Sequence, residues 1–259
     1  MDDLSFTDPC VLFALRRESQ AFRREFRAHQ RFPGAPCWAR FCGPAWLTVL
    51  VLETGLGARR TEAALNWLLG APLLGNLPYR PKMVLSAGFS GALQEGLHVG
   101  DLVLATEVVD TEGNSWPTTW PGELPPGEWR PPLRRGRLLT APHLVGSAEE
   151  KKALGRQHEA AAVDMETAVI ARCCRQRGMP FGCLRAISDD ATTSLSPRLT
   201  SLLRAGRVSP LRLLAALARS PRIVPELFRL ARQTRLAGEQ LGKALGEVLT
   251  LTLPWAADL

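Results

Sequence analysis

Neither of the common phosphate-binding loops occurs in this sequence. The chain has no Gly-x-x-x-x-Gly-Lys-Ser/Thr motif, whose backbone cradles the phosphates of ATP, and no Gly-x-Gly-x-x-Gly motif of the dinucleotide-binding kind. The turn Gly55-Leu56-Gly57 is a lone Gly-x-Gly, which by itself is weak evidence for anion binding. Binding of ATP or NAD is therefore not indicated, and we expect no cofactor.

Metal-binding patterns are also missing. Two of the six cysteines, Cys173 and Cys174, are adjacent, and the sequence has no Cys-x-x-Cys and no His-x-x-x-His spacing. We therefore expect no metal site, and we interpret the cysteines as reduced thiols of the core.

Signals for export and for membrane insertion are absent from the sequence. The first residues, Met1-Asp2-Asp3, are acidic and lack the basic-then-apolar order of a signal peptide. No apolar run reaches the length that spans a bilayer. On this pattern we expect a cytoplasmic protein.

The composition is that of a globular α/β protein. With 259 residues, of which 46% are hydrophobic and 22% charged, the chain is long enough for one sizeable core. Strand-like and helix-like segments alternate, and no break favours a second domain. We expect a single domain over residues 1–259, a three-layer α/β/α fold with a central, mixed, twisted sheet.

The positive charge is concentrated near the C-terminus. The chain has a net charge of +7, and residues 198–235 contain nine arginines and one acidic residue, Glu226, a local balance of +8. Apolar residues at helical spacing predict a basic helical extension from about residue 198. Such helices could lie on an anionic membrane surface or pack on the sheet with solvated arginines. Nucleic-acid binding fits less well, because Phe228 is the segment's one aromatic residue.

A second unusual segment covers residues 114–132, which contain three tryptophans and six prolines. We expect a long irregular insertion, and loops of this length are commonly functional or disordered. It could form a lid or wall of a binding site, or its tryptophans could pack against the core.

Two strand ends carry the most informative carboxylates. Residues 160–163 predict a strand followed by Asp164-Met165-Glu166 and a helix, and residues 181–187 predict a strand that ends at Ser188-Asp189. Because ligands of open α/β sheets bind at the carboxyl ends of strands, we expect Glu166 and Asp189 to converge. Alternatively, Asp164 and Glu166 are merely favourable at a helix N-terminus and Asp189 belongs to a turn.

Three further segments are landmarks of the sequence. They are a strand and turn from Val11 to Glu18, a glycine turn before a helix from Glu53 to Gly57, and a glycine-rich segment from Ser86 to Leu93 together with Val99 to Val103. In the third, Gly88 and Gly91 would let a ligand approach the backbone. With the two carboxylate motifs, these segments resemble the nucleoside phosphorylase and nucleosidase superfamily over roughly residues 9–190. The resemblance is to 5′-methylthioadenosine/S-adenosylhomocysteine nucleosidases and to purine nucleoside phosphorylases.

The resemblance implies cleavage of a purine N-ribosyl bond. Asp189, oriented by Ser188, would protonate purine N7. Glu166 would hold the ribose hydroxyls above an apolar floor formed by Met165, and Glu18 would position the attacking water. The same resemblance implies that Asp164 also binds the substrate.

The sequence also departs from the phosphorylase pattern. Arg17 and Gly55 could bind phosphate, but the second phosphate arginine aligns with Ser86, and the serine of the Gly-rich segment aligns with Phe89. Water is therefore favoured as nucleophile, while phosphorolysis stays open. The base-stacking phenylalanine has no clear match, so His143 is a candidate for that place.

The Leu-Arg-Arg-Glu turn and the basic C-terminal segment look most like phosphorylase-type proteins associated with hopanoid lipid synthesis. That resemblance implies an adenosine with a lipid at its 5′ position, such as adenosylhopane, and peripheral contact with a membrane. The superfamily implies a homo-oligomer. A non-catalytic nucleoside-binding or lipid-binding relative is the alternative from another class, because a fold does not guarantee an activity.

Overall fold

A computed structural model describes residues 9–32, 34–43, 49–70, 81–119, 132–196, 200 and 223–251. Two expectations fall partly outside these residues. They are the lid or wall formed by residues 120–131 and the basic helix predicted before residue 223, with six of its nine arginines.

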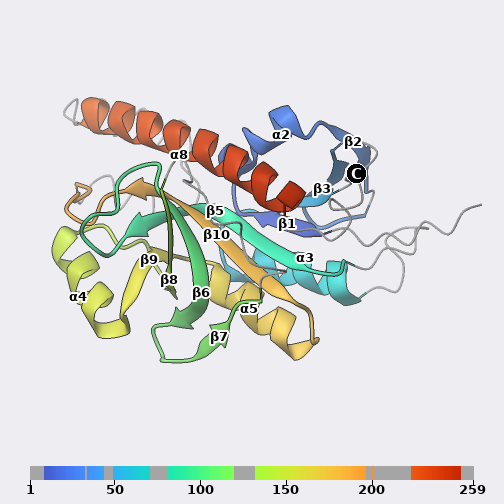
Figure 1. Ribbon diagram of the computed structural model, residues 1–259, viewed down its shortest axis with the longest axis horizontal. Coiled ribbons are helices and arrows are strands. Elements are labelled where there is room, and N and C mark those ends of the chain that lie inside the picture. Colours follow the sequence, from blue (N-terminus) through green and yellow to red (C-terminus); the bar gives the residue numbers. More distant parts are fainter. Residues whose placement is uncertain are drawn as a thin grey trace, which may run out of the picture.

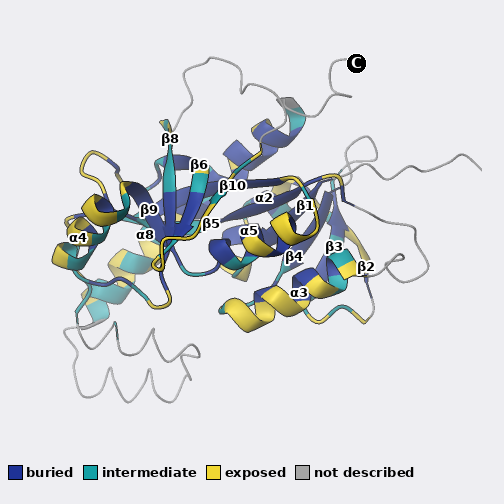
Figure 2. Cartoon of the chain, turned by 90° about the horizontal axis from the view of Figure 1, so that it is seen from below, coloured by how far each residue is buried: buried dark blue, intermediate teal, exposed yellow. Residues whose placement is uncertain are grey.

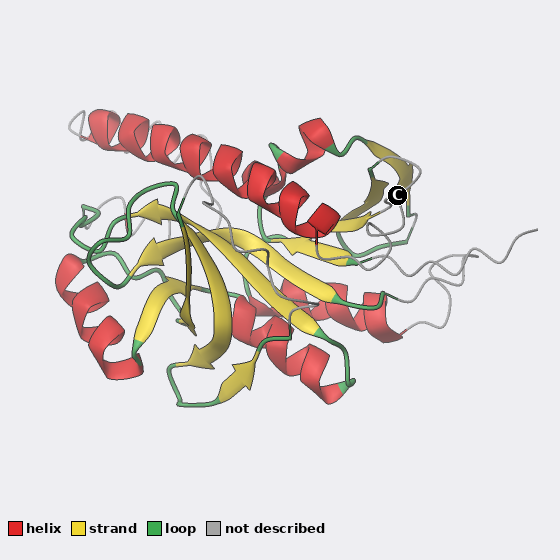
Figure 3. Cartoon of the chain, viewed as in Figure 1, coloured by secondary structure: helices red, strands yellow, loops and turns green. Residues whose placement is uncertain are grey.

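The described chain forms one ten-stranded sheet with helices packed around it (Figures 1 and 3). The strands are β1 (Cys10–Phe13), β2 (Ala28–Arg31), β3 (Trp38–Cys42), β4 (Val49–Glu53), β5 (Val84–Ala92), β6 (Leu102–Asp110), β7 (Ser115–Pro117), β8 (Leu133–Thr140), β9 (Ala160–Asp164) and β10 (Phe181–Asp189). The helices are α1 (Arg16–Ser19), α2 (Phe22–Glu25), α3 (Ala58–Gly70), α4 (Ala148–His158), α5 (Thr167–Gln176) and α8 (Ile223–Leu251).

The sheet is mixed, and part of it closes on itself. Its order is β10-β6-β8-β9-β5-β1-β4-β3-β2, and β10 also pairs with β5. Strands β1 and β10 run parallel to β5, whereas β9 runs antiparallel to the last residues of β5. Five strands therefore form a closed ring, and the other four paired in line extend from β5.

Alternating residues of β1 show why helices cover both faces. Cys10 and Leu12 pack in the cluster that contains α3 and α5, whereas Val11 and Phe13 pack in the cluster that contains α2 and α8. Strands buried on both faces require cover on both sides. In Figure 2 the strands are mainly dark blue, while α3 and α5 show exposed outer sides. The expected three-layer α/β/α architecture is confirmed.

Strand β5 is longer than the sequence indicates. We expect a strand that ends near Ala87 and a glycine-rich turn after it, yet β5 continues through Gly88 and Gly91 to Ala92. The reason is pairing, because β10 accompanies β5 as far as Gly91 and β9 pairs with its last two residues. The glycine-rich segment is thus a rigid part of the sheet.

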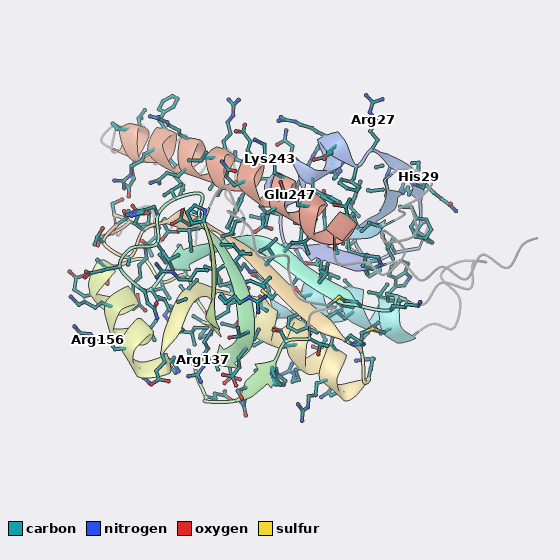
Figure 4. All side chains as sticks on the ribbon, in the orientation of Figure 1. Arg27, His29, Arg137, Arg156, Lys243 and Glu247 are labelled. Carbon is teal, nitrogen blue, oxygen red and sulfur yellow. The ribbon has the colours of Figure 1, made fainter. Side chains whose placement is uncertain are left out.

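The two halves of helix α8 have different surroundings, and only the first half belongs to the basic segment. Its second half packs on the sheet through Ala237, Leu241, Ala244, Leu245, Val248 and Leu249, all buried. Lys243 and Glu247, labelled in Figure 4, are exposed on the same helix. The first half is more open, and Phe228 is 72% exposed there. No helix within the described ranges combines the length and hydropathy needed to cross a bilayer.

Candidate active site

Two of the three predicted carboxylates, Glu18 and Glu166, line one small cavity, and Asp189 is not among the residues that line it. The strands that carry the three carboxylates do not all run in the same direction. Glu18 follows β1 on α1, and Asp189 ends β10, so both belong to strands parallel to β5. Glu166 follows β9, which approaches from the opposite direction with Val163 opposite Gly91. Sheet closure, rather than the edge of an open parallel sheet, brings Glu166 to this site.

Glu18 is held by two backbone groups. Its Oε1 accepts a hydrogen bond of 2.9 Å from the Phe89 N–H, and its Oε2 accepts one of 2.7 Å from the Leu15 N–H. A Cβ at position 88 would lie 2.7 Å from Glu18 Oε1 and 3.0 Å from Arg185 Nη1. Gly88 therefore makes room for the protein's own carboxylate and guanidinium.

The environment of Glu18 suits a general base. Burial raises the pKa of its carboxyl group, and the hydrogen bonds from Phe89 and Leu15 and the charge of Arg185 oppose that effect. A carboxylate with a raised pKa accepts a proton from water more readily near neutral pH.

Glu166 is a second buried carboxyl group of this kind. Its Oε1 accepts a hydrogen bond of 3.0 Å from the Gly57 N–H. Burial, followed by the nearby charge of Asp164, raises the pKa of Glu166 to about 7. The turn Gly55-Leu56-Gly57 thus directs an N–H at Glu166, while the Gly55 N–H is bonded to the Ala14 carbonyl at 3.0 Å.

Asp164 has a structural partner that sequence reasoning missed. Arg185 is buried in β10, and its Nη2 donates to Asp164 Oδ2 at 2.9 Å, to Ser86 Oγ at 2.7 Å and to Thr167 Oγ1 at 2.5 Å. A lone arginine within the otherwise apolar run 181–187 was the available signal. Asp164 therefore forms a buried ion pair with Arg185, and both residues line the cavity.

Asp189 also has a partner that the sequence did not suggest. Its Oδ2 forms an ion pair with Nζ of the fully buried Lys151, and its Oδ1 accepts a hydrogen bond of 2.7 Å from Ser188 Oγ. The predicted pair Ser188 and Asp189 is therefore in direct contact. A Cβ at position 91 would lie 3.0 Å from Asp189 Oδ2, so Gly91 makes room for this carboxylate as Gly88 does for Glu18.

These contacts form two groups. Glu18, Glu166, Asp164 and Phe89 line one small cavity, with Arg185 and Ser86 in its wall. Asp189 lies beside Gly91, three residues along β5 from Gly88, or about 10 Å at the usual rise of a strand.

Several buried polar atoms at this site lack a hydrogen-bond partner in the described structure. They are Ser90 Oγ, Arg185 Nε and Asp190 Oδ1. Buried polar groups are normally paired, so a cluster of unpaired atoms beside the carboxylates is consistent with a polar ligand.

Three other predicted site residues lie in different surroundings. His143 is exposed, and its Nε2 lies 3.2 Å from Glu150 Oε1 on α4. Arg17 is exposed and lines a separate hollow of about 370 Å³ between α1, α2 and α8. Met165 is half-buried beside Glu166. Neither His143 nor Arg17 is among the residues that line the carboxylate cavity.

The described residues contain no group of three or more His, Cys, Asp or Glu side chains placed to hold a metal ion. All six cysteines are free. Burial raises the pKa of the Cys183 thiol to about 11, so this thiol is a weak nucleophile at neutral pH.

Comparison with known proteins shows the family of this chain. A family model described as the phosphorylase superfamily matches residues 45–127 and 121–205. The 5′-methylthioadenosine/S-adenosylhomocysteine nucleosidase of Haemophilus ducreyi is 33% identical over 168 residues, which make up 55% of this chain and 68% of that protein.

Solved structures show the same fold. The corresponding nucleosidase of S. pneumoniae, with a transition-state inhibitor, has a TM-score of 0.67 at 15% identity and covers 93% of this chain and 98% of its own. Futalosine hydrolase of Helicobacter pylori has a TM-score of 0.64 at 18% identity, covering 94% and 97%. The resemblance inferred from the motifs is confirmed, and the chain belongs to the phosphorylase superfamily of enzymes.

Proposed function

We propose that this enzyme hydrolyses the N-ribosyl bond of a purine nucleoside, and that the substrate is a 5′-substituted adenosine. The observation that carries the proposal is that two carboxylates, Glu18 and Asp189, each lie against a glycine of the same strand, Gly88 and Gly91 of β5. The nucleosidase names of the relatives support it.

The proposed reaction follows from the role that each carboxyl group can play. Glu18 accepts a proton from water as the water oxygen bonds to C1′ of the ribose. The C1′–N9 bond breaks, its electron pair moves into the purine, and Asp189 delivers a proton to N7. Glu166 holds the ribose hydroxyls while positive charge develops on the sugar, a division of work like that in glycoside hydrolysis.

The contacts favour water over phosphate as the nucleophile. Arg17 lines the separate hollow, and the Gly55 N–H is already bonded to Ala14. Ser86, which aligns with a phosphate arginine, is bound to Arg185. Phosphorolysis stays the alternative, because Arg185 is a cation close to Glu18.

An apolar 5′ substituent suits two exposed leucines near the carboxylates. Leu15 precedes α1 and Leu56 lies in the turn that contacts Glu166, and each is 37% exposed. We extend the proposal to a lipid substituent such as that of adenosylhopane. The rival is a small thioether group, as in 5′-methylthioadenosine, and a non-catalytic binder would use the same surface.

The first half of α8 supports a peripheral membrane contact. Exposed Phe228 adjoins Arg229, with Arg232 and Arg235 on the following turns. Replacing the three arginines by glutamine should abolish sedimentation with anionic vesicles and leave cleavage of a soluble nucleoside intact. Unchanged sedimentation would remove this part of the proposal.

A cytoplasmic location and a homo-oligomer stay predictions, and sedimentation velocity tests the oligomeric state.

The deciding experiment measures adenine release from adenosine, 5′-methylthioadenosine, S-adenosylhomocysteine and adenosylhopane, each with and without phosphate. We expect release from at least one 5′-substituted adenosine without phosphate, with free ribose as the sugar product. Release that requires phosphate and yields ribose 1-phosphate would establish the phosphorylase alternative. Binding without release from any of the four would establish the non-catalytic alternative.

A further inference from the structure

Lys151 on α4 is the one cation in contact with Asp189 among the described residues. The side chain of Lys151 is 0% exposed, and its Nζ has three acceptors. They are Asp189 Oδ2, the Asp190 carbonyl at 2.8 Å and the Thr193 carbonyl at 3.0 Å. An ammonium group has three N–H donors, so every donor of Lys151 is used.

The other charged groups on the elements around this ion pair contact residues other than Lys151 and Asp189. On α4, Glu150 faces His143, and Lys152 faces Glu95 at 3.7 Å. On β9, Asp164 is bound to Arg185. Asp190 contributes its carbonyl to Lys151, while its Oδ1 has no partner.

The ion pair raises a problem for the proposed function. A general acid must carry a proton, but a carboxylate paired with an ammonium group is in its charged form and has none to give. Three acceptors surround the Lys151 Nζ, and only an ammonium group has three N–H donors to satisfy them. The geometry therefore assigns the proton of this ion pair to Lys151.

We propose that Lys151 is the proton source for the departing purine, acting through Asp189. This inference rests on the proposed nucleoside cleavage. As the C1′–N9 bond breaks, the Asp189 carboxylate takes a proton from the Lys151 ammonium and delivers a proton to N7. Asp189 ends the step as a carboxylate and Lys151 as a neutral amine, which solvent reprotonates after the base has left.

The hydrogen bonds of Lys151 fit both of its states. After the transfer, the amine retains two N–H groups, and two neutral acceptors remain, the carbonyls of Asp190 and Thr193. In this step Lys151 acts on the substrate only through Asp189. Lys151 is therefore a positioning residue that supplies the proton.

The test is the pH dependence of turnover in Lys151→Met, which keeps the length of the side chain and removes its proton. Asp189 must then carry the proton alone. We expect turnover within about tenfold of wild type at pH 5 and at least about a hundredfold below wild type at pH 8, since general acid catalysis is typically worth ~10² to 10⁴. A purely structural role of Lys151 predicts an equal loss at both values.

Controls separate the possible failures. Lys152→Met, at the exposed neighbouring position, should follow the wild-type profile. If Lys151→Met does not fold, as judged by circular dichroism, Lys151→Gln retains two N–H donors and should show the same dependence on pH. Equal losses at pH 5 and pH 8, or normal turnover at pH 8, would overturn the inference and leave nucleoside cleavage intact.

The activity of the wild-type enzyme is the last control. Wild-type enzyme that releases no base from any nucleoside would overturn the proposed function and this inference together.

Discussion

The backbone N–H of Phe89 donates a hydrogen bond of 2.9 Å to Glu18 Oε1 across 71 residues of sequence. Both oxygens of Glu18 accept backbone N–H groups, so the carboxylate is fixed in place before any substrate arrives. Such preorganisation is what a group that positions water requires.

Glu18→Gln should lower turnover at least about a hundredfold, because an amide cannot accept the proton from water. Arg17→Ala should reduce turnover no more than severalfold, since Arg17 is exposed and lines a separate hollow. Steady-state kinetics with free ribose as the measured product tests both. A large loss in Arg17→Ala together with strict phosphate dependence would reverse the choice of nucleophile.

Gly88→Ala should impair activity more than its small size suggests. The new Cβ would lie 2.7 Å from Glu18 Oε1, in the sheet, where the backbone cannot retreat, so Glu18 must move. We expect a loss in turnover of about tenfold or more, since small displacements of a catalytic group are costly. Gly70→Ala is the matched control, because a Cβ at position 70 meets no atom within 4 Å. Equal activity of the two variants would contradict the assigned role of Gly88.

The sequence predicted the ends of β9 and β10 well, the end of β5 wrongly, and the contacts of the side chains at these ends poorly. Glu166 and Asp189 could be placed because each follows an apolar strand, a local pattern. The environment of Lys151 could not be predicted, because nothing in residues 147–158 distinguishes Lys151 from Lys152. It is decided by the contact with Thr193, which lies 42 residues further along the chain. Local patterns specify elements, whereas closure of the sheet specifies which side chains meet.

The interpretation of the glycines shows the same limit. Gly88 and Gly91 indicated a close approach of some ligand to the backbone. In the structure, the atoms that approach them are the carboxylate oxygens of Glu18 and Asp189. The residue type correctly predicted a lack of space, but only the paired strands reveal what occupies it.

Helix α8 should be essential for folding because its second half is part of the core. Leu245 is fully buried against the sheet, so Leu245→Ala should lower the free energy of unfolding by about 2 to 5 kcal/mol. Lys243→Ala, on the exposed face of the same helix, should change it by less than about 0.5 kcal/mol. Urea unfolding followed by circular dichroism measures both. Similar values for the two variants would mean that α8 is not packed as described.

The buried carboxyl group of Glu166 predicts a pH-dependent stability. Its pKa is about 7 in the folded protein, above its ordinary value, so the folded state binds more protons than the unfolded state between about pH 4.5 and pH 7. Stability associated with protonated Glu166 is present at low pH and is lost as pH rises through 7. Glu166→Gln does not titrate and should gain on the order of 2 kcal/mol relative to wild type between pH 5 and pH 8. A constant difference between the two proteins would refute the assignment, and the variant should lose ribose binding in any case.

Asp189→Asn should remove activity and also destabilise the fold, for separate reasons. Asparagine cannot deliver a proton to N7, so turnover should fall at least about a hundredfold. It also leaves Lys151 buried without its counter-charge, which should lower the free energy of unfolding by about 3 kcal/mol.

The double variant Lys151→Met/Asp189→Asn separates the two effects. It removes the unpaired charge, so we expect it to be more stable than Asp189→Asn alone and equally inactive. Chemical unfolding and adenine release, measured on all four proteins of the cycle, give both answers. Recovery of activity along with stability would show that the loss in Asp189→Asn comes from misfolding and that the proton donor lies elsewhere.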